Sequence, residues 1–170
     1  MKKKLLITGI SGLLGNNLAY TFRDKYDITG WYNLHKVLIP GVDSFKIDIT
    51  DTQSVKKFLS DYKPAIILHC ASLTNIDYCE NNKAETRKVN VEGTQNIVSA
   101  CGNQDTKLVY ISTDSVFDGK KGTYAEDDPA SPYNYYGLTK YKGEDAVRAH
   151  KNHIIVRTNM FGWNIQNKHS

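Results

Sequence analysis

The stretch Gly9-Ile10-Ser11-Gly12-Leu13-Leu14-Gly15 decides the fold of this 170-residue chain. It follows the apolar run Lys4–Thr8 and leads into Leu13–Lys25, where apolar residues recur at helical spacing. Glycines at such a strand-to-helix turn permit a tight bend and a close approach of the backbone to a pyrophosphate. The helix N-terminus offers unpaired N–H groups and the positive end of its dipole to phosphates. The pattern therefore predicts a phosphate-binding loop, with a purely structural turn as the alternative.

Outward from this loop, strand-length apolar runs alternate with helix-length periodic segments. Further strands are predicted at Ile28–Tyr32, Ser44–Ile47, Ala65–His69, Lys107–Ser112 and His153–Arg157. Further helices are predicted at Thr52–Tyr62, Lys83–Cys101 and Tyr133–His150, and Pro40-Gly41 marks a turn in a connection without a helix. Strands that are apolar throughout indicate a parallel sheet buried on both faces. The predicted fold class is α/β, a Rossmann-type doubly wound parallel sheet over residues 1–170.

The composition fits a globular protein, with 40% hydrophobic and 24% charged residues. Basic residues are scattered apart from Lys2–Lys4, so the net charge of +4 does not indicate a nucleic-acid partner. Three cysteines without a C-x-x-C spacing indicate neither a disulfide framework nor a metal site, and favour the cytoplasm. No stretch is apolar enough for a membrane span, and the early glycines favour a buried first strand over a signal peptide.

The end of the predicted second strand bears on the choice of cofactor. An acidic residue about 20 residues beyond the glycine loop normally binds the ribose hydroxyls of NAD. Here the strand ends at Trp31-Tyr32-Asn33, with no acid at its tip. His35 and Lys36 follow directly and are placed to meet a 2′-phosphate. The sequence therefore favours NADP(H) over NAD(H).

Tyr136 and Lys140 are four residues apart and share one face of a predicted helix. A lysine ammonium beside a tyrosine favours the phenolate and is expected to lower its pKa from about 10. Thr113 ends the preceding strand and can donate a hydrogen bond to a substrate carbonyl oxygen. Together these groups predict proton transfer coupled to hydride transfer from a nicotinamide, whereas an ordinary surface pair is the alternative.

In combination, these motifs resemble the extended short-chain dehydrogenase/reductase family, and within it most resemble the dTDP-4-dehydrorhamnose reductases. The residues that carry the resemblance are Gly9–Gly15, Asp48, Asn90-Val91-Glu92-Gly93-Thr94, Ser112–Gly119, Tyr136-x-x-x-Lys140, Ala71–Glu80 and Ile155-Val156-Arg157-Thr158. The resemblance covers nearly the whole chain in the family's order and implies the strand order 3-2-1-4-5-6.

The resemblance also implies a role for individual residues. Thr113, Tyr136 and Lys140 match the family's catalytic residues. The implied cofactor-binding residues are Gly9, Ser11, Gly12, Leu13, Leu14, Gly15, Asn33, Asp48, Ile49, Cys70, Ala71, Ser72, Asn90, Ser112, Tyr136, Lys140, Arg157 and Asn159. The implied substrate-binding residues are Thr113, Asp114, Ser115 and Val116, with Ser115 where these reductases often carry an aromatic residue. His69 is expected to be a core histidine rather than a metal ligand.

The implied reaction is reduction of a nucleotide-activated keto-sugar, with hydride from nicotinamide C4 and Tyr136 as proton donor. A nucleotide-sugar epimerase or dehydratase and a non-catalytic dinucleotide-binding regulatory subunit are the alternatives. Family members build most of the sugar pocket from a smaller C-terminal region, and Phe161–Ser170 ends this chain. We therefore expect a truncated chain with little or no reductase activity of its own. Apolar surface is expected to lie uncovered beside the sixth strand and to favour self-association, such as a homodimer.

Overall fold

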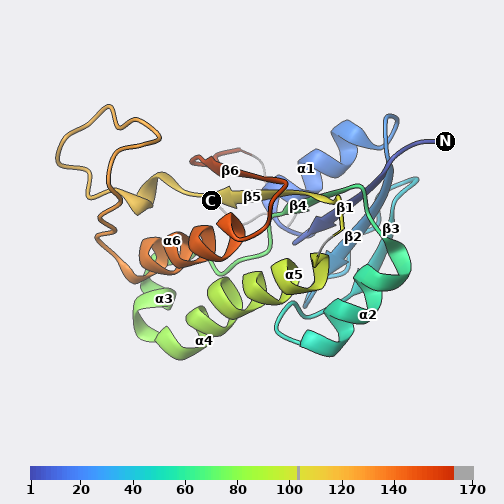
Figure 1. Cartoon of the computed structure of the whole chain (residues 1–170), viewed down its shortest axis with the longest axis horizontal. Helices are drawn as coiled ribbons and strands as arrows, with labels where there is room; N and C mark the ends of the chain where they lie inside the picture. The colour runs from blue at the N-terminus through green and yellow to red at the C-terminus, as the bar shows by residue number, and fades with distance from the viewer. Residues whose placement is uncertain (103, 163–170) are drawn as a thin grey trace.

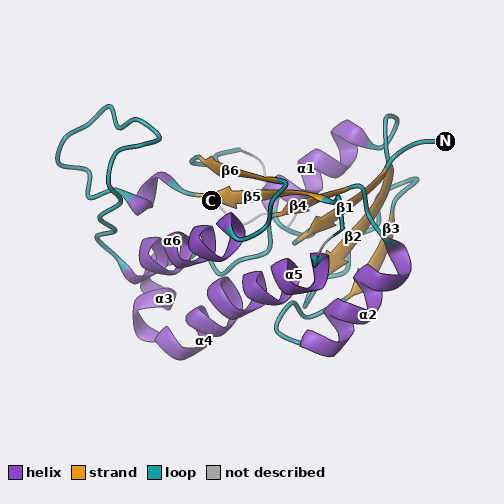
Figure 2. Ribbon diagram, viewed as in Figure 1, coloured by secondary structure: helices purple, strands orange, loops and turns teal. Residues whose placement is uncertain are grey.

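The computed structural model describes residues 1–102 and 104–162, which form one sheet with helices on both faces (Figures 1 and 2). The parallel strands lie in the order β3-β2-β1-β4-β5-β6. They are β1 (Lys4–Thr8), β2 (Asp27–Tyr32), β3 (Asp43–Lys46), β4 (Ile66–His69), β5 (Lys107–Ser112) and β6 (His153–Arg157). The helices are α1 (Leu13–Phe22), α2 (Thr52–Tyr62), α3 (Ile76–Asn81), α4 (Lys83–Arg87), α5 (Gly93–Cys101) and α6 (Tyr135–Arg148). The predicted fold class and strand order are confirmed.

Strands β1 and β2 are buried on both faces, because successive side chains of a strand point to opposite sides and both sides are covered, whereas β3 is largely exposed. In β1, Leu5 and Ile7 enter a core with Ala19 of α1, whereas Leu6 enters a second core with Val55 of α2 and Ile97 of α5. Helix α1 therefore covers one face, and α2, α5 and α6 cover the other (Figure 1). Among the described residues, no helix is both long and apolar enough to cross a membrane.

The glycine loop makes the turn from β1 into α1 by packing backbone against backbone. Gly9 has φ +67°, and a Cβ there would lie 2.8 Å from the backbone of Ala71, which follows β4. A Cβ on Gly15 would collide with the carbonyl oxygen of Gly9 and lie 2.9 Å from the Cα of Ile10. Both positions therefore admit no side chain, and the first turn of α1 lies directly against the end of β1.

Two helical segments differ from the prediction. The region predicted as one helix over Lys83–Cys101 is divided by a π-helical turn at Lys88–Glu92. Such turns are frequently found at functional sites, and this one buries Asn90. Helix α3 was not predicted, because its six residues are too few to show a helical period.

Helix ends also moved by a few residues. Helix α6 begins at Tyr135 rather than Tyr133, because Asn134 accepts a hydrogen bond from the backbone N–H of Gly137 and caps it. Helix α1 ends at Phe22 rather than Lys25.

The apolar surface expected beside the sixth strand is confirmed. Strand β6 pairs with β5 along one side, and Ile154 is 44% exposed. Met160 and Phe161, which follow β6, are also exposed. Val109 and Ile111 of β5, on the α1 side of the sheet, are only partly buried.

The collision around Gly15 generates a prediction. Gly15→Ala should lower the free energy of unfolding by about 1–3 kcal/mol, because the added methyl meets backbone that cannot move as a side chain does. Asn17→Ala on the exposed side of α1 is the control and should change it by at most about 0.5 kcal/mol. Chemical denaturation monitored by circular dichroism gives both values. Equal stability of Gly15→Ala and wild type would contradict the packing described here.

Candidate functional site

The crevice between the carboxyl ends of β1 and β4 is the point where the strand order reverses, which is where open α/β sheets bind ligands. Gly12 precedes α1 at its N-terminus and offers no side-chain cap, and the first turn of α1 carries no acidic residue. The backbone N–H groups of Leu13 and Leu14 therefore lie at the positive end of an uncapped helix. Gly9 keeps the loop against Ala71. This cradle fits a dinucleotide pyrophosphate.

The residues expected to hold the adenosine half follow β2 and β3. Asn33 comes after β2 and is exposed. Asp48 comes after β3, is exposed, and accepts a hydrogen bond from the backbone N–H of Thr50 at 2.8 Å. Ile49 is buried and packs against Gly93, where a Cβ would lie 2.7 Å from its side chain. The backbone between β3 and α2 is thereby fixed against α5.

Thr113 and Tyr136 meet where β5 and α6 come together. Thr113 directly follows β5 and is buried, and its hydroxyl donates to Oδ1 of Asp114 at 3.1 Å. Its side chain also lies close enough to the Tyr136 phenol to act on the pKa of Tyr136. The Thr113 hydroxyl also accepts a hydrogen bond from the backbone N–H of Ser115 at 3.1 Å. The structure therefore brings together two of the three predicted catalytic side chains.

The third, Lys140, is buried one turn further along α6. Its Nζ lies 4.2 Å from the centroid of the Tyr110 ring, which is a cation–π contact. Burial lowers the pKa of Lys140 to about 7, although Cys70 and Glu144 act in the opposite direction. Desolvation likewise raises the pKa of the partly buried Cys70 thiol.

The electrostatic expectation for Tyr136 was wrong in direction. Burial raises the pKa of Tyr136, and the neighbouring Thr113 side chain opposes that rise only in part. The lysine was expected to lower this pKa, but desolvation outweighs any such effect. Tyr136 is therefore a protonated phenol at neutral pH.

Asn90 joins the loop after β4 to α6 through its side chain. Its Oδ1 accepts from the backbone N–H of Leu73 at 2.8 Å, and its Nδ2 donates to the Leu73 carbonyl at 3.0 Å. The same Nδ2 donates to Thr139 Oγ1 at 3.1 Å. Asn90 is fully engaged in supporting the site rather than pointing a free amide at a ligand.

Glu80, which the sequence analysis did not single out, is a second cap of α6. Its Oε1 accepts a hydrogen bond from the backbone N–H of Tyr135 at 2.5 Å, next to the cap supplied by Asn134. The Lys83 ammonium lies over the Tyr135 ring at 5.4 Å. Helices α3 and α4 thus fix the start of α6 immediately before Tyr136. Glu80 could have been identified from the sequence only if α3 had been predicted, and a helix of six residues is too short to show a helical period.

Glu144 forms a buried charge cluster beneath the site. Its side chain is fully buried and accepts hydrogen bonds from Ser112 at 2.6 Å and from Arg157 at 2.8 and 3.0 Å. Arg148 adds a contact at 2.9 Å. Burial acts to raise the pKa of Glu144, but these partners outweigh it and hold the pKa below its ordinary value. The cluster ties the ends of β5 and β6 to α6.

Arg157 is directed away from the glycine loop. Its Nε and Nη2 bind Glu144, its Nη1 donates to the carbonyl oxygen of Glu126 at 3.2 Å, and its guanidinium lies over the Phe117 ring. Phe117 in turn stacks on Tyr124 with ring centroids 4.3 Å apart. Every nitrogen of the Arg157 guanidinium already has a partner within the protein. The structure therefore does not test the predicted contact between Arg157 and a cofactor.

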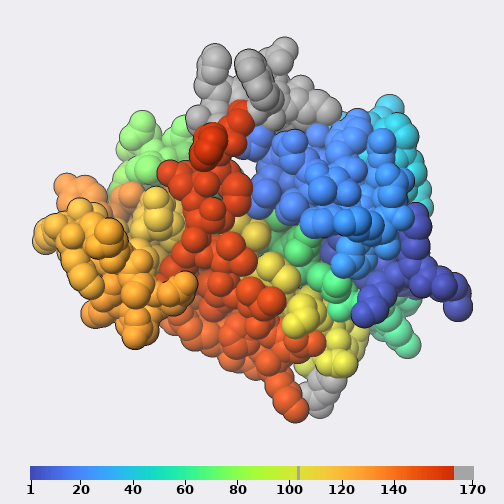
Figure 3. All heavy atoms as spheres, turned by 90° about the horizontal axis from the view of Figure 1, so that it is seen from above, coloured from blue at the N-terminus to red at the C-terminus, as the bar shows by residue number. Residues whose placement is uncertain are grey.

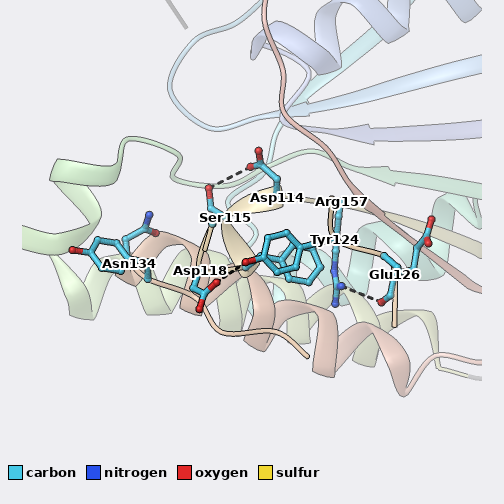
Figure 4. A pocket seen from close by; sticks show the side chains of 11 residues that line it. Asp114, Ser115, Asp118, Tyr124, Glu126, Asn134 and Arg157 are labelled. Atoms are coloured by element: carbon cyan, nitrogen blue, oxygen red, sulfur yellow. Dashed lines mark hydrogen bonds between the residues drawn. The ribbon is translucent and has the colours of Figure 1, made fainter. Parts of the chain in front are cut away.

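A pocket of about 540 Å³ opens beside these residues. Its lining comprises Asp114, Ser115, Phe117, Asp118, Gly119, Tyr124, Ala125, Glu126, Tyr133, Asn134 and Arg157. Figure 4 shows the Tyr124 hydroxyl turned to Asp118 and Arg157 turned to Glu126. Most of the lining comes from the segment between β5 and α6, residues 113–134, which protrudes as a lobe next to β6 in Figure 3. Two expected substrate residues, Asp114 and Ser115, thus line a pocket, whereas Val116 is buried behind them.

The remaining predicted residues are distributed around the same edge of the sheet. Ser72 follows β4 and is partly buried, and Asn159 follows β6 and is exposed. His69 is confirmed as a buried core histidine with both ring nitrogens hydrogen-bonded. Among the described residues no group of three metal-binding side chains is present. The last residues of the segment Phe161–Ser170, from 163 to 170, lie outside the described residues.

The fold and this arrangement are those of a Rossmann-type domain of the extended short-chain dehydrogenase/reductase class. The chain matches the RmlD substrate binding domain family over residues 2–167 and belongs to that family. The dTDP-4-dehydrorhamnose reductase of Mycolicibacterium smegmatis is 35% identical over 161 residues, covering 93% of this chain and 46% of the relative. The methionine adenosyltransferase 2 subunit beta of Xenopus tropicalis is 33% identical over 146 residues, covering 85% of this chain and 42% of the relative.

Solved structures agree with this assignment. The dTDP-4-dehydrorhamnose reductase of Bacillus anthracis in complex with NADP has a TM-score of 0.80 and 34% identity, covering 93% of this chain and 54% of that one. The UDP-Glc/GlcNAc 4-epimerase of Campylobacter jejuni has a TM-score of 0.83 and 25% identity, covering 91% of this chain and 53% of that one. The chain spans about half the length of the curated relatives that it matches.

The buried Lys140 makes stability depend on pH. Its pKa is about 7 in the folded protein against 10.5 in an exposed lysine, so between these values the unfolded chain binds a proton that the folded chain does not. The Lys140 contribution to folding therefore becomes more favourable as pH rises from about 7 to about 10.5, and its full cost is present below pH 7. We predict that Lys140→Met is more stable than wild type, most so below pH 7.

Thermal unfolding across this pH range measures the difference. Lys142→Met, on the exposed side of the same helix, is the control and should show no such pH-dependent difference. A difference between Lys140→Met and wild type that stays constant with pH would contradict the burial of a titrating amine.

Proposed function

We propose that this chain is the cofactor-binding and catalytic half of an NADP(H)-dependent reductase that acts on the keto group of a nucleotide-activated sugar. The observation that carries the proposal is the pairing of Thr113 with Tyr136 at the carboxyl end of β5, in a domain whose glycine loop leads into an uncapped helix N-terminus. The reductase relatives and the NADP complex support it. Three free cysteines fit a cytoplasmic enzyme.

The raised pKa of Tyr136 suits the reductive direction. A bound nicotinamide would supply the hydride. Tyr136 holds the proton at its phenol oxygen and donates it to the carbonyl oxygen as negative charge develops there. Thr113 lies beside Tyr136, and its one hydroxyl proton, which it donates to Asp114 in this structure, would turn to the same oxygen when substrate binds.

Lys140 is placed to complete the cofactor site. Its amine is buried behind Tyr136 on the same face of α6 and rests on the Tyr110 ring. Ribose hydroxyls are hydrogen-bonding partners that would offset its desolvation. Its proposed roles are therefore to hold the nicotinamide ribose and, when protonated, to stabilise negative charge on Tyr136.

The preference for NADP(H) is argued from charge. Asn33, His35 and Lys36 follow β2 and are all exposed, and no acid stands among them. An exposed cation is a partner for a 2′-phosphate, whereas a carboxylate there would repel it.

The experiment that tests the catalytic proposal is Tyr136→Phe in the protein as its gene encodes it. NADPH-dependent reduction of a nucleotide keto-sugar should be lost, because the phenol proton is gone, while NADPH affinity stays nearly unchanged. Turnover is followed by NADPH absorbance, and affinity by fluorescence titration. Tyr135→Phe, one residue away and with Thr139 rather than a lysine at the fourth position, is the control and should keep turnover. Undiminished turnover in Tyr136→Phe would remove its assigned role.

A second experiment tests the cofactor preference on the 170-residue chain itself. The double variant His35→Ala, Lys36→Ala should weaken NADPH binding by about three- to fivefold and leave NADH binding within twofold, because one exposed charge pair contributes up to about 1 kcal/mol. Equal changes for both cofactors would reject the role of these residues.

The two alternative functions have distinct signatures in the same experiments. NADPH binding without turnover of any nucleotide-sugar would favour a regulatory role, as the resemblance to the methionine adenosyltransferase 2 beta subunit suggests. NAD retained through purification would favour an epimerase or dehydratase, which regenerates its cofactor within each cycle. Readily dissociating NADPH fits the proposed reductase.

A further inference from the structure

A buried histidine that the proposed reaction does not use lies at the carboxyl end of β4, beside the end of β1. His69, the last residue of β4, is 1% exposed and stands between two threonine hydroxyls. Its Nδ1 lies 2.7 Å from Oγ1 of Thr8, the last residue of β1, and its Nε2 lies 3.0 Å from Oγ1 of Thr94 in α5. The carboxyl ends of β1 and β4 border the ligand crevice.

The hydrogen-bond partners of Thr94 and Thr8 indicate which nitrogen of His69 carries the proton. Thr94 donates its one hydroxyl proton to the Asn90 carbonyl at 2.8 Å, so its oxygen accepts from His69 Nε2–H. Nδ1 then accepts from the Thr8 hydroxyl, whose oxygen accepts the backbone N–H of Ala71 at 3.2 Å. The opposite tautomer would leave the Thr8 proton without an acceptor among the described residues, a cost that buried groups avoid.

The chain of hydrogen bonds continues from Asn90 to the catalytic helix. Asn90 Nδ2 donates to Thr139 Oγ1, and Thr139 donates to the carbonyl oxygen of Tyr136 at 2.8 Å. A directed set of donors and acceptors therefore runs from the loop after β4 to the backbone of the residue assigned as proton donor. The five side-chain members, Thr8, His69, Thr94, Asn90 and Thr139, are all buried, so each of their bonds is costly to leave unmade.

We propose that His69 is a positioning residue: as the neutral Nε2–H tautomer, it couples the two strand ends that border the cofactor crevice to the helix that carries Tyr136. The proposal rests on the proposed function, because the crevice is the assigned cofactor site. A neutral ring suits this task, since it presents one donor and one acceptor in fixed directions.

The surroundings of the ring favour the neutral form. Burial lowers the pKa of His69 to about 3, and the nearby Lys140 acts in the same direction. The ring packs tilted against Tyr110 with centroids 5.4 Å apart, and Lys140 lies over that same aromatic ring. Protonation would turn the Nδ1 acceptor into a donor, and the Thr8 hydroxyl proton would then lose its acceptor, so the directed chain would be broken.

The test compares two substitutions at Thr94 in the 170-residue chain. Thr94→Val keeps the shape but removes the acceptor for Nε2–H, whereas Thr94→Ser keeps the hydroxyl. Thr106→Val is the matched control, because it removes a buried hydroxyl that donates to the Pro64 carbonyl at 2.8 Å, at the opposite edge of the sheet. NADPH dissociation constants are measured by fluorescence well below each melting temperature.

We expect Thr94→Val to weaken NADPH binding by about fivefold or more, a typical coupling between linked sites. Thr94→Ser and Thr106→Val should stay within twofold of wild type, even where Thr106→Val lowers the melting temperature. A merely structural role for the network predicts instead that both valine variants melt earlier and bind NADPH as wild type does, and that result would overturn the proposal.

Side-chain ¹⁵N spectra of wild type give a second measurement that needs no variant. His69 should be in the Nε2–H form and stay neutral from pH 5 to pH 8, and its ring signals should shift when NADPH binds. An Nδ1–H form, or ring signals unaffected by NADPH, would overturn the positioning role. A wild-type chain that binds no NADPH would overturn the proposed function and this role with it, whereas normal binding by Thr94→Val would overturn this role alone.

Discussion

The close approach of Gly9 to Ala71 is the constraint on which the rest of the structure depends. A side chain at Gly9 would meet backbone at 2.8 Å, so the ends of β1 and β4 lie together only because that position is glycine. Gly15 then lets α1 begin directly against the same turn. The uncapped N-terminus of α1, the crevice beside it and the position of the loop after β4 all follow from this backbone contact. The chemistry at Tyr136 is placed relative to that fixed edge.

Two buried charges on α6 show how the same helix serves opposite purposes. Glu144 is fully buried and remains ionised because Arg157, Ser112 and Arg148 replace its lost hydration. Lys140 is buried against an aromatic face, and among the described residues it has no such set of partners, so desolvation lowers its pKa to about 7. The first group anchors strand ends and suits a structural role. The desolvation of Lys140 has no such compensation from the described residues, and hydrogen bonds to the hydroxyl groups of a ligand can relieve it. This is expected of a binding group rather than a structural one.

The parts of the fold that could be predicted from the sequence were those with a clear period or a demanding turn. The glycine loop and the apolar strands predicted a parallel α/β sheet, the family resemblance implied the strand order, and the spacing of Tyr136 and Lys140 placed both on one face of α6. Short helices and the direction of pKa shifts could not be predicted. Helix α3 has too few residues to show a period, yet its Glu80 caps the catalytic helix. The direction of the Tyr136 pKa shift depends on tertiary burial, which sequence spacing does not report.

A crystal structure of this chain with NADPH is the most direct test of the central claim, that the crevice at the ends of β1 and β4 is a dinucleotide site facing Tyr136. The account predicts the pyrophosphate at the backbone of Leu13 and Leu14, the adenosine beside Asp48, and C4 of the nicotinamide ring facing Tyr136 and Thr113. A dinucleotide bound elsewhere, or bound with its nicotinamide turned away from Tyr136, would contradict it.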